Sequence, residues 1–196
     1  LQGVKFDISY ADGTKIGSYE TNENGEINLE NLLKGTIKIV ETKTDDMHIL
    51  ESHPIEVDLD YDDEKEIVLE NKRIKGKIKI VKTSENQNKV LDTEAGSPIE
   101  GAKFNIYNKQ NEFIEQITTD KNGTAYSSEL DKGEYRVKEV ETGEWYIYEP
   151  ITANAEIKEN NEIVEISNSL GMESAMLKGG TNPENKLKMQ IFYTTF

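Results

Sequence analysis

The chain contains the same sequence pattern twice. Residues 3–41 align with residues 101–139 without a gap, at a spacing of 98 residues, and 12 of the 39 paired positions are identical. A weaker match at a spacing of 97 pairs residues 67–71 with residues 164–168. A repeat of this length is too long for a solenoid unit and has the size of a whole small domain. The sequence therefore predicts two related domains in tandem.

Apolar and polar residues alternate along short segments in both copies, as expected for strands that are buried on one face. The apolar positions of these segments are Val4, Phe6 and Ile8; Ile37 and Ile39; Val57 and Leu59; Ile78 and Ile80; Tyr135 and Val137; and Val164 and Ile166. Asn-Gly, Asp-Gly and Lys-Gly pairs separate the segments, and these pairs are typical of tight turns. The pattern predicts an all-β chain, with one antiparallel β-sandwich in each copy.

We expect the first domain at residues 1–74 and the second at residues 75–169. The second copy begins with a strand at residues 77–82, followed by a polar loop at residues 83–97, and the first copy has no equivalent of this strand. The first domain therefore lacks its opening strand and should have an unpaired sheet edge, a feature that favours association with other strands.

Residues 170–196 match neither copy, and we expect a linker and a tail there. One interpretation of this region is a partly ordered end of the chain. The other is a strand at residues 187–193 that, with Lys186 or Lys188, fills the vacant edge of the first domain or begins a third one.

The composition excludes several classes of function. The net charge is -15, so the chain cannot neutralise phosphates, and neither nucleic acid nor an anionic membrane is an expected partner. The absence of cysteine excludes disulfides and thiolate chemistry, and two histidines are too few for a His-based catalytic centre. The acidic run at residues 58–64 lacks the spacing of a calcium loop and reads as a solvated turn, with weak surface calcium binding as the alternative. We expect a monomer without cofactor or metal.

Three polar residues lie at positions that should face the interior of the second domain. Lys82 follows Ile78 and Ile80 on one face of its strand, and Glu139 follows Tyr135 and Val137 in the same way. Asn168 follows Val164 and Ile166. Since side chains two apart share a face of a strand, all three should point inward.

A buried lysine beside a buried glutamate is costly unless the two are paired, and burial favours the neutral form of each. A neutral Lys82 amine could attack the side-chain carbonyl of Asn168, with Glu139 moving the proton, and leave an amide cross-link after release of ammonia. The alternatives are a buried ion pair without a covalent bond, or attack by Lys77 or Lys79 from the opposite face.

The segments at residues 101–104, 119–123 and 130–141, together with Asn168, resemble the Cna B-type domains of Gram-positive surface proteins and pilins, which are also called SpaA-like or prealbumin-like. This resemblance covers roughly residues 1–169. It implies a compact sandwich of prealbumin-like or inverse immunoglobulin-like topology, and a spontaneous isopeptide bond assisted by an acidic residue. The family lysine corresponds to Lys82, its glutamate to Glu139 and its asparagine to Asn168. In the first domain the glutamate corresponds to Glu41 and the asparagine to Asn71, whereas the lysine has no counterpart.

The resemblance implies a structural stalk or pilin-like segment, not an enzyme, that lies outside the cell on the wall or in a pilus. Neighbouring domains of the same surface protein are the expected partners, and any signal peptide or anchor is expected outside these residues. Two alternatives are an adhesin module that binds a host protein or glycan through residues 83–97 or Trp145, and an accessory module of a secreted enzyme.

Overall fold

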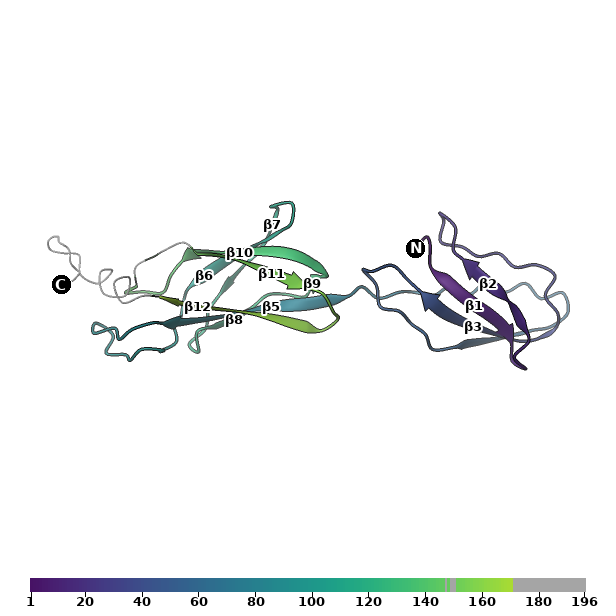
Figure 1. Cartoon of the computed structure of the whole chain (residues 1–196), viewed down its shortest axis with the longest axis horizontal. Helices are drawn as coiled ribbons and strands as arrows, with labels where there is room; N and C mark the ends of the chain where they lie inside the picture. The colour runs from purple at the N-terminus through teal and green to yellow at the C-terminus, as the bar shows by residue number, and fades with distance from the viewer. Residues whose placement is uncertain (147, 149–150, 171–196) are drawn as a thin grey trace. The chain divides into compact units, whose positions relative to one another are not determined.

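The computed structural model describes residues 1–146, 148 and 151–170, and for residues 168–170 it describes the backbone alone. The chain divides into two compact units, Leu1–Ile74 and Lys75–Phe196, which are called unit 1 and unit 2 (Figure 1). The described residues form strands, turns and loops, and none of them lies in a helix that could cross a membrane. The strand expected at residues 187–193 lies outside the described residues.

Unit 1 is built on one antiparallel sheet of four strands: β1 (Lys5–Tyr10), β2 (Lys15–Glu20), β3 (Gly35–Lys43) and β4 (Ile55–Leu59). Their order in the sheet is β2-β1-β3-β4. Val4, Phe6, Ile8 and Ile37 are buried on one face of this sheet, with Ile27 and Leu29 packed against them. The alternation predicted for these strands therefore corresponds to one buried face.

Unit 2 contains two sheets. The strands are β5 (Lys75–Ser84), β6 (Lys103–Asn108), β7 (Phe113–Thr118), β8 (Thr124–Tyr126), β9 (Leu130–Asp131), β10 (Gly133–Glu141), β11 (Thr152–Ile157) and β12 (Glu162–Leu170). One sheet has the order β11-β10-β6-β7, and it corresponds strand by strand to the sheet of unit 1. The other has the order β12-β5-β8, with β9 also paired to β5.

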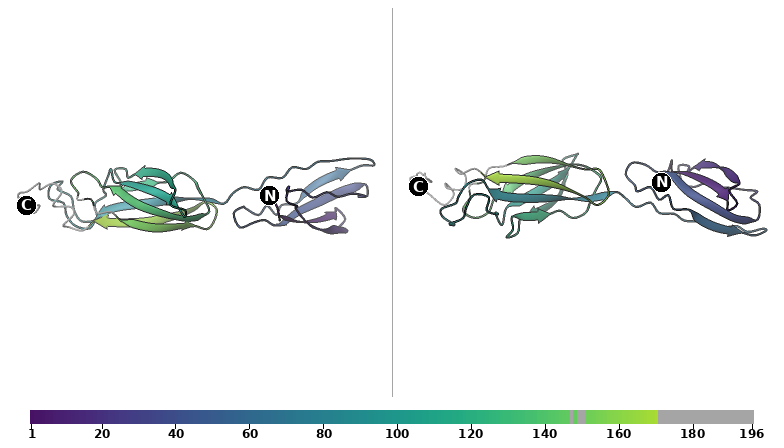
Figure 2. Two further views of the ribbon diagram at one scale, coloured as in Figure 1. Left: turned by 90° about the horizontal axis from the view of Figure 1, so that it is seen from above. Right: turned by 60° about the horizontal axis from the view of Figure 1, so that its bottom comes forward.

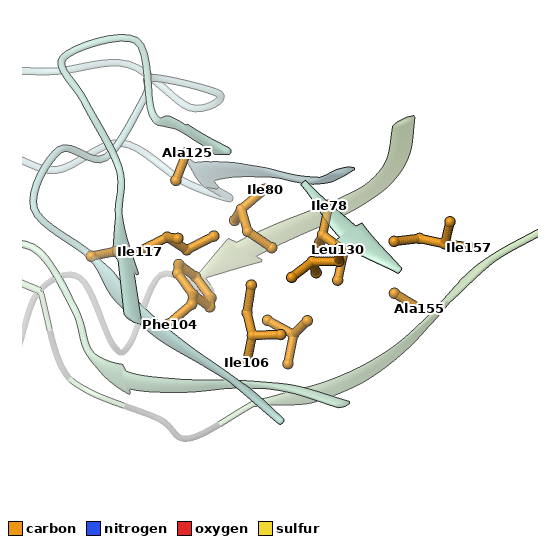
Figure 3. Packing of buried hydrophobic residues seen from close by; sticks show 11 residues of the cluster. Ile78, Ile80, Phe104, Ile106, Ile117, Ala125, Leu130, Ala155 and Ile157 are labelled. Carbon is orange, nitrogen blue, oxygen red and sulfur yellow. The ribbon is translucent and has the colours of Figure 1, made fainter. Parts of the chain in front are cut away.

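The core of unit 2 lies between its two sheets. Side chains from β5, such as Ile78 and Ile80, meet side chains from β6, such as Phe104 and Ile106, and Ile157 of β11 extends the cluster (Figure 3). Because each strand contributes every second residue, the two inner faces interdigitate in the manner of a β-sandwich. The predicted all-β fold is confirmed.

One strand pair differs from the antiparallel arrangement that the sequence suggested. β12 pairs with β5 in parallel, in a continuous register from Glu162 beside Gly76 to Leu170 beside Ser84 (Figure 2). These are the first and last strands in the described part of unit 2, so the strands between them form the long connection that a parallel pair requires.

Unit 1 has no equivalent of the sheet β12-β5-β8 among its described residues. The segments that correspond to β8 and β12, residues 26–28 and 65–71, are not in strands. The sequence predicts only an unpaired edge, whereas no described residue of unit 1 corresponds to β5, the central strand to which β8 and β12 pair in unit 2.

Candidate functional site

Lys82 lies near the end of β5, with its side chain in the interior of unit 2. Buried and partly exposed residues alternate along the whole of β5, and Lys82 is buried on the same face as Ile78 and Ile80. Its relative exposure is 0%, and it is the largest fully buried side chain among the described residues. A lysine is almost never buried to this extent without a partner.

Glu139 of β10 supplies that partner. Its carboxylate is also fully buried, and Lys82 Nζ lies 2.6 Å from Glu139 Oε1. The main chain of Glu139 is held as well: its N–H donates to the carbonyl of Ile151, and its carbonyl accepts from the Tyr148 hydroxyl. The two sheets of unit 2 thus bring the amine and the acid together across the core.

Asn168 is placed by the pairing of β12 with β5. The register sets its backbone directly beside that of Lys82, with Ser167 beside Val81 and Ser169 beside Thr83. The side chain of Asn168 lies outside the described part of the structure. The meeting of all three groups therefore stays a prediction, based on the adjacent backbone positions.

Unit 1 contains the acid and the amide without the lysine. Asn71 Nδ2 donates to both carboxylate oxygens of Glu41 at 2.9 Å, and it also faces the Ile49 carbonyl at 3.4 Å. Glu41 is 5% exposed and lies opposite Phe6 in the sheet register, as Glu139 lies opposite Phe104 in unit 2. The two glutamates therefore occupy equivalent places, and one is paired with an amide while the other is paired with an amine.

The arrangement in unit 2 supports proton transfer. A proton can pass between the Lys82 amine and the Glu139 carboxyl along one short hydrogen bond, and a dry interior favours the neutral pair over the ion pair. A neutral amine is a nucleophile, whereas an ammonium is not. The same acid could then return the proton to a leaving group.

The other lysines considered on β5 lie in a different environment. Lys79 is partly exposed and forms a salt bridge of 3.0 Å with Glu165 of β12. The hydrogen bond from Lys79 to Glu165, together with the charge of that carboxylate, raises the pKa of Lys79 and keeps its amine protonated. Lys77 shares the partly exposed face of the strand.

The remaining candidates do not assemble into a site. The residues of the acidic run at 58–64 are exposed, except for Leu59, which is partly buried. No group of three His, Asp or Glu in the described ranges could hold a metal. His48 and His53 each bond a nearby carboxylate, Asp45 and Glu51 respectively. Trp145 and Tyr148 are exposed, while Tyr146 is buried against Ile99.

Sequence reasoning missed Asn88, a fully buried residue of the loop between β5 and β6. Its side chain accepts from the N–H groups of Val90 and Leu91 and donates to the Trp145 carbonyl. Strand alternation carries no signal for a loop residue of this kind.

Comparison with known proteins identifies the family to which both units are similar. A family model described as the SpaA prealbumin-like fold domain matches residues 1–73 and again residues 76–170. The chain is 37% identical over 81 residues to the trypsin-resistant surface T6 protein of Streptococcus pyogenes serotype M6, an alignment that covers 39% of this chain and 15% of that protein.

Among solved structures, the TIE protein of Bacillus anthracis is similar with a TM-score of 0.72 and 26% identity, covering 87% of this chain and 31% of that one. GBS52, the minor pilin of Streptococcus agalactiae, is matched over 87% of this chain and 84% of its own, with 19% identity and a TM-score of 0.40. The chain therefore spans only a small part of the T6 protein and less than a third of the TIE protein. The match of the family model to both units confirms the resemblance, and the chain belongs to the SpaA family of prealbumin-like fold domains.

Proposed function

We propose that this chain is a structural segment of a Gram-positive surface protein or pilus, in which an amide bond between Lys82 and Asn168 closes unit 2. The observation that carries the proposal is the buried pair of Lys82 and Glu139, whose side chains lie 2.6 Å apart. Lys82 is on β5, and its register neighbour on β12 is Asn168. The family match of both units and the similarity to the surface T6 protein support the coarser part of the proposal.

The reaction needs no external reagent. The neutral amine of Lys82 attacks the side-chain carbonyl carbon of Asn168, and the protonated Glu139 carboxyl gives its proton to the amide nitrogen, which leaves as ammonia. The Glu139 carboxylate then takes the surplus proton from the Lys82 nitrogen. One C–N bond forms and one breaks, and the acid is regenerated. Since the reaction consumes its own side chains, it happens once, and the chain is not an enzyme.

The strand order gives the bond a mechanical role. Among the described residues of unit 2, β5 is the first strand and β12 the last, and the two run side by side in the same direction. Tension that enters at Lys75 passes along β5 to Lys82, crosses the amide to Asn168 and leaves through the end of β12. The residues between the two bonded positions then bear none of the load. Without cysteine, a disulfide cannot provide this tie.

This role implies a place outside the cell, either on the wall or in a pilus, with neighbouring domains of the same surface protein as partners. The acidic surface keeps such segments soluble and mutually repelling. Binding of a host ligand is a property separate from this role.

Intact-mass spectrometry of the purified chain tests the proposal. The unmodified chain should weigh one ammonia less than its calculated mass, and proteolysis should yield a branched peptide that joins Lys82 to Asn168. Lys82→Ala and Glu139→Ala should each have the full calculated mass.

Lys79→Ala is the matched control, because Lys79 lies on the same strand with its side chain on the opposite face. This variant should keep the loss of ammonia. A full calculated mass for the unmodified chain, or a branch at Lys79 or Lys77, would contradict the proposal.

A further inference from the structure

The sheet β11-β10-β6-β7 of unit 2 (Figure 1) carries an open depression on its outer face. Its volume is about 460 Å³, and residues of β10, β11 and the turn between β6 and β7 line it. Small-molecule sites in proteins enclose roughly 300–1,000 Å³. The depression is therefore large enough for a ligand, and it uses none of the groups of the Lys82 site.

The floor of the depression contains four polar side chains from two adjacent strands. The register sets Arg136 of β10 beside Asn154 of β11, and Glu134 beside Glu156. The residues that alternate with them belong to the core or pack against it, so these four side chains face outward. Two carboxylates directly opposite each other on antiparallel strands are unfavourable for folding. The stability of the sheet therefore does not explain this choice of residues.

The guanidinium of Arg136 is held in one orientation at this floor. Its central carbon lies 5.1 Å from the centre of the Tyr107 ring, and the guanidinium donates to the side-chain oxygen of Asn111 in the turn. The turn is itself fixed, because the Asn108 side chain accepts from two of its backbone N–H groups. A guanidinium has more N–H groups than the bond to Asn111 uses, so a preorganised donor remains for a ligand.

Unit 1 has different residues at the equivalent positions. The places of the two glutamates are taken by Thr36 and Asp58, which form a hydrogen bond of 2.5 Å with each other. The place of the arginine is taken by Lys38, and that of the asparagine in the turn by Gly13, which has no side chain to hold a cation. The set of polar groups in the depression is therefore particular to unit 2.

The charges around the depression indicate the class of ligand. Its charged residues are two cations, Lys109 and Arg136, and two carboxylates, Glu134 and Glu156, so their formal charges cancel. Lys109 Nζ already lies 3.5 Å from Glu134 Oε1. A charged ligand would therefore meet repulsion as well as attraction. A neutral ligand with several hydroxyl groups would not, since hydroxyls can donate to the carboxylates and accept from Arg136, and the Asn154 amide can do both.

We propose that this depression is a binding site for a neutral carbohydrate. The sugar hydroxyls donate to the two glutamates and accept from Arg136 and Asn154. The apolar part of the lining, from Tyr135 and Ala155, contacts the C–H groups of the sugar ring. The inference goes beyond the structural role proposed above and does not depend on the amide bond in unit 2.

An NMR titration of the isotope-labelled full chain with three neutral oligosaccharides, namely chitotriose, lactose and maltotriose, tests the inference. At least one of them should bind saturably and shift the backbone resonances of Asn111, Arg136 and Asn154 most. Chitotriose contains the N-acetylglucosamine of bacterial walls, whereas lactose contains the galactose of animal glycans. The sugar that binds therefore also distinguishes these two sources.

Charged counterparts of the same sugars are the matched ligand controls. The deacetylated form of chitotriose carries amines, and sialyllactose is lactose with an added acidic sugar. Each should bind more weakly than its neutral parent, because the charges of the site already cancel one another.

Two variants test the assigned residues. Arg136→Ala should weaken binding by about tenfold or more, since it removes a charged donor. Asn154→Ala should also weaken binding, and its exposed position on the edge strand β11 should leave the fold intact, which thermal unfolding would verify. Lys38→Ala, at the equivalent position of unit 1, is the matched control and should bind as the unmodified chain does.

Absence of saturable binding by all three neutral sugars, largest shifts at residues outside the depression, or tighter binding of the charged counterparts would each overturn the inference. Binding that neither Arg136→Ala nor Asn154→Ala weakens would do so as well. These results are distinguishable from failure of the amide bond in unit 2, because that bond is read from the mass of the chain without sugar.

Discussion

Lys82 and Glu139 lie 57 residues apart in sequence and 2.6 Å apart in space, with no exposed side-chain surface on either. Their contact joins the two sheets of unit 2. Because both groups would be costly to bury alone, each depends on the other for its place in the core.

We predict that removing one partner destabilises unit 2 more than removing both. Lys82→Met leaves the Glu139 acid in the core without its lysine, and Glu139→Leu leaves the Lys82 amine without its acid. Breaking a buried pair in this way costs about 3–5 kcal/mol, whereas replacing both members by apolar residues is often close to neutral. Urea unfolding should therefore show the double variant to be more stable than either single one. All three variants lack the proposed amide, so the comparison does not depend on it, and a double variant less stable than both singles would contradict the prediction.

Gly123 is predicted to be intolerant of a side chain. It has a φ of +71°, and a Cβ at this position would lie 2.4 Å from the Lys82 carbonyl oxygen and 3.0 Å from Pro98 Cβ. Gly96 is the matched control, because its φ is +84° but nothing lies within 4 Å of the added atom. Gly96→Ala should lower the free energy of unfolding only by the cost of holding alanine in the left-handed conformation, about 1–2 kcal/mol. Gly123→Ala should lower the free energy of unfolding, measured with denaturant, by a larger amount, since the Lys82 N–H also donates to the Gly123 carbonyl. Equal decreases for the two variants would contradict the prediction.

Thr119 is predicted to stabilise unit 2 through its hydroxyl. The side chain is buried, accepts from the Ala102 N–H at 2.9 Å and donates to the Ile99 carbonyl at 2.8 Å. Thr119→Val preserves the shape but leaves both main-chain groups without this partner, at a cost of about 1–3 kcal/mol for a buried unsatisfied group. Thr119→Ser keeps the hydroxyl, so its unfolding temperature should fall less than that of Thr119→Val. Thr21 makes the equivalent bond to the Val4 N–H in unit 1, so Thr21→Val should affect unit 1 in the same direction.

Asp120 is predicted to make the stability of unit 2 depend on acid pH. The backbone N–H of Thr124, and then that of Asn122, lower the pKa of this carboxylate from its ordinary value of 3.8. Because the pKa is lower in the folded chain than in the unfolded chain, the stabilisation is complete above the ordinary value and is lost as the pH falls through the folded value. Asn22 makes the equivalent bonds in unit 1 with a neutral amide.

The Asp120→Asn variant provides the measurement. Its difference in unfolding free energy from the unmodified chain should shrink as the pH is lowered from neutral to below the ordinary aspartate value. A difference that stays constant over this range would show that the charge of Asp120 does not contribute.

Much of the fold could be predicted because its signal is local. The alternation of Ile78, Ile80 and Lys82 predicts a strand with these side chains on one face, whatever the strand pairs with. The Asn-Gly pair at residues 122–123 predicts a turn because glycine adopts a positive φ at little cost. The repeat likewise assigns Glu41 and Glu139 to equivalent positions without any knowledge of their surroundings.

Partners across long distances in the chain could not be predicted in this way. Nothing in the alternation of β5 or β12 indicates that they pair in parallel, because the side-chain period is the same in either direction. Only the sheet order shows that β5, which has no counterpart among residues 1–74, is the central strand of its sheet.

The amino-acid sequence alone thus determined which residues form strands, which face of each strand is apolar, and that the acid and amide occur in both units while the lysine occurs in one. The tertiary structure decided that Lys82 meets Glu139 and that the backbone of Asn168 runs beside Lys82. The physical reason is that backbone geometry sets the direction of a side chain within one or two residues. The pairing of strands, in contrast, depends on contacts that form only when the whole unit closes around its core.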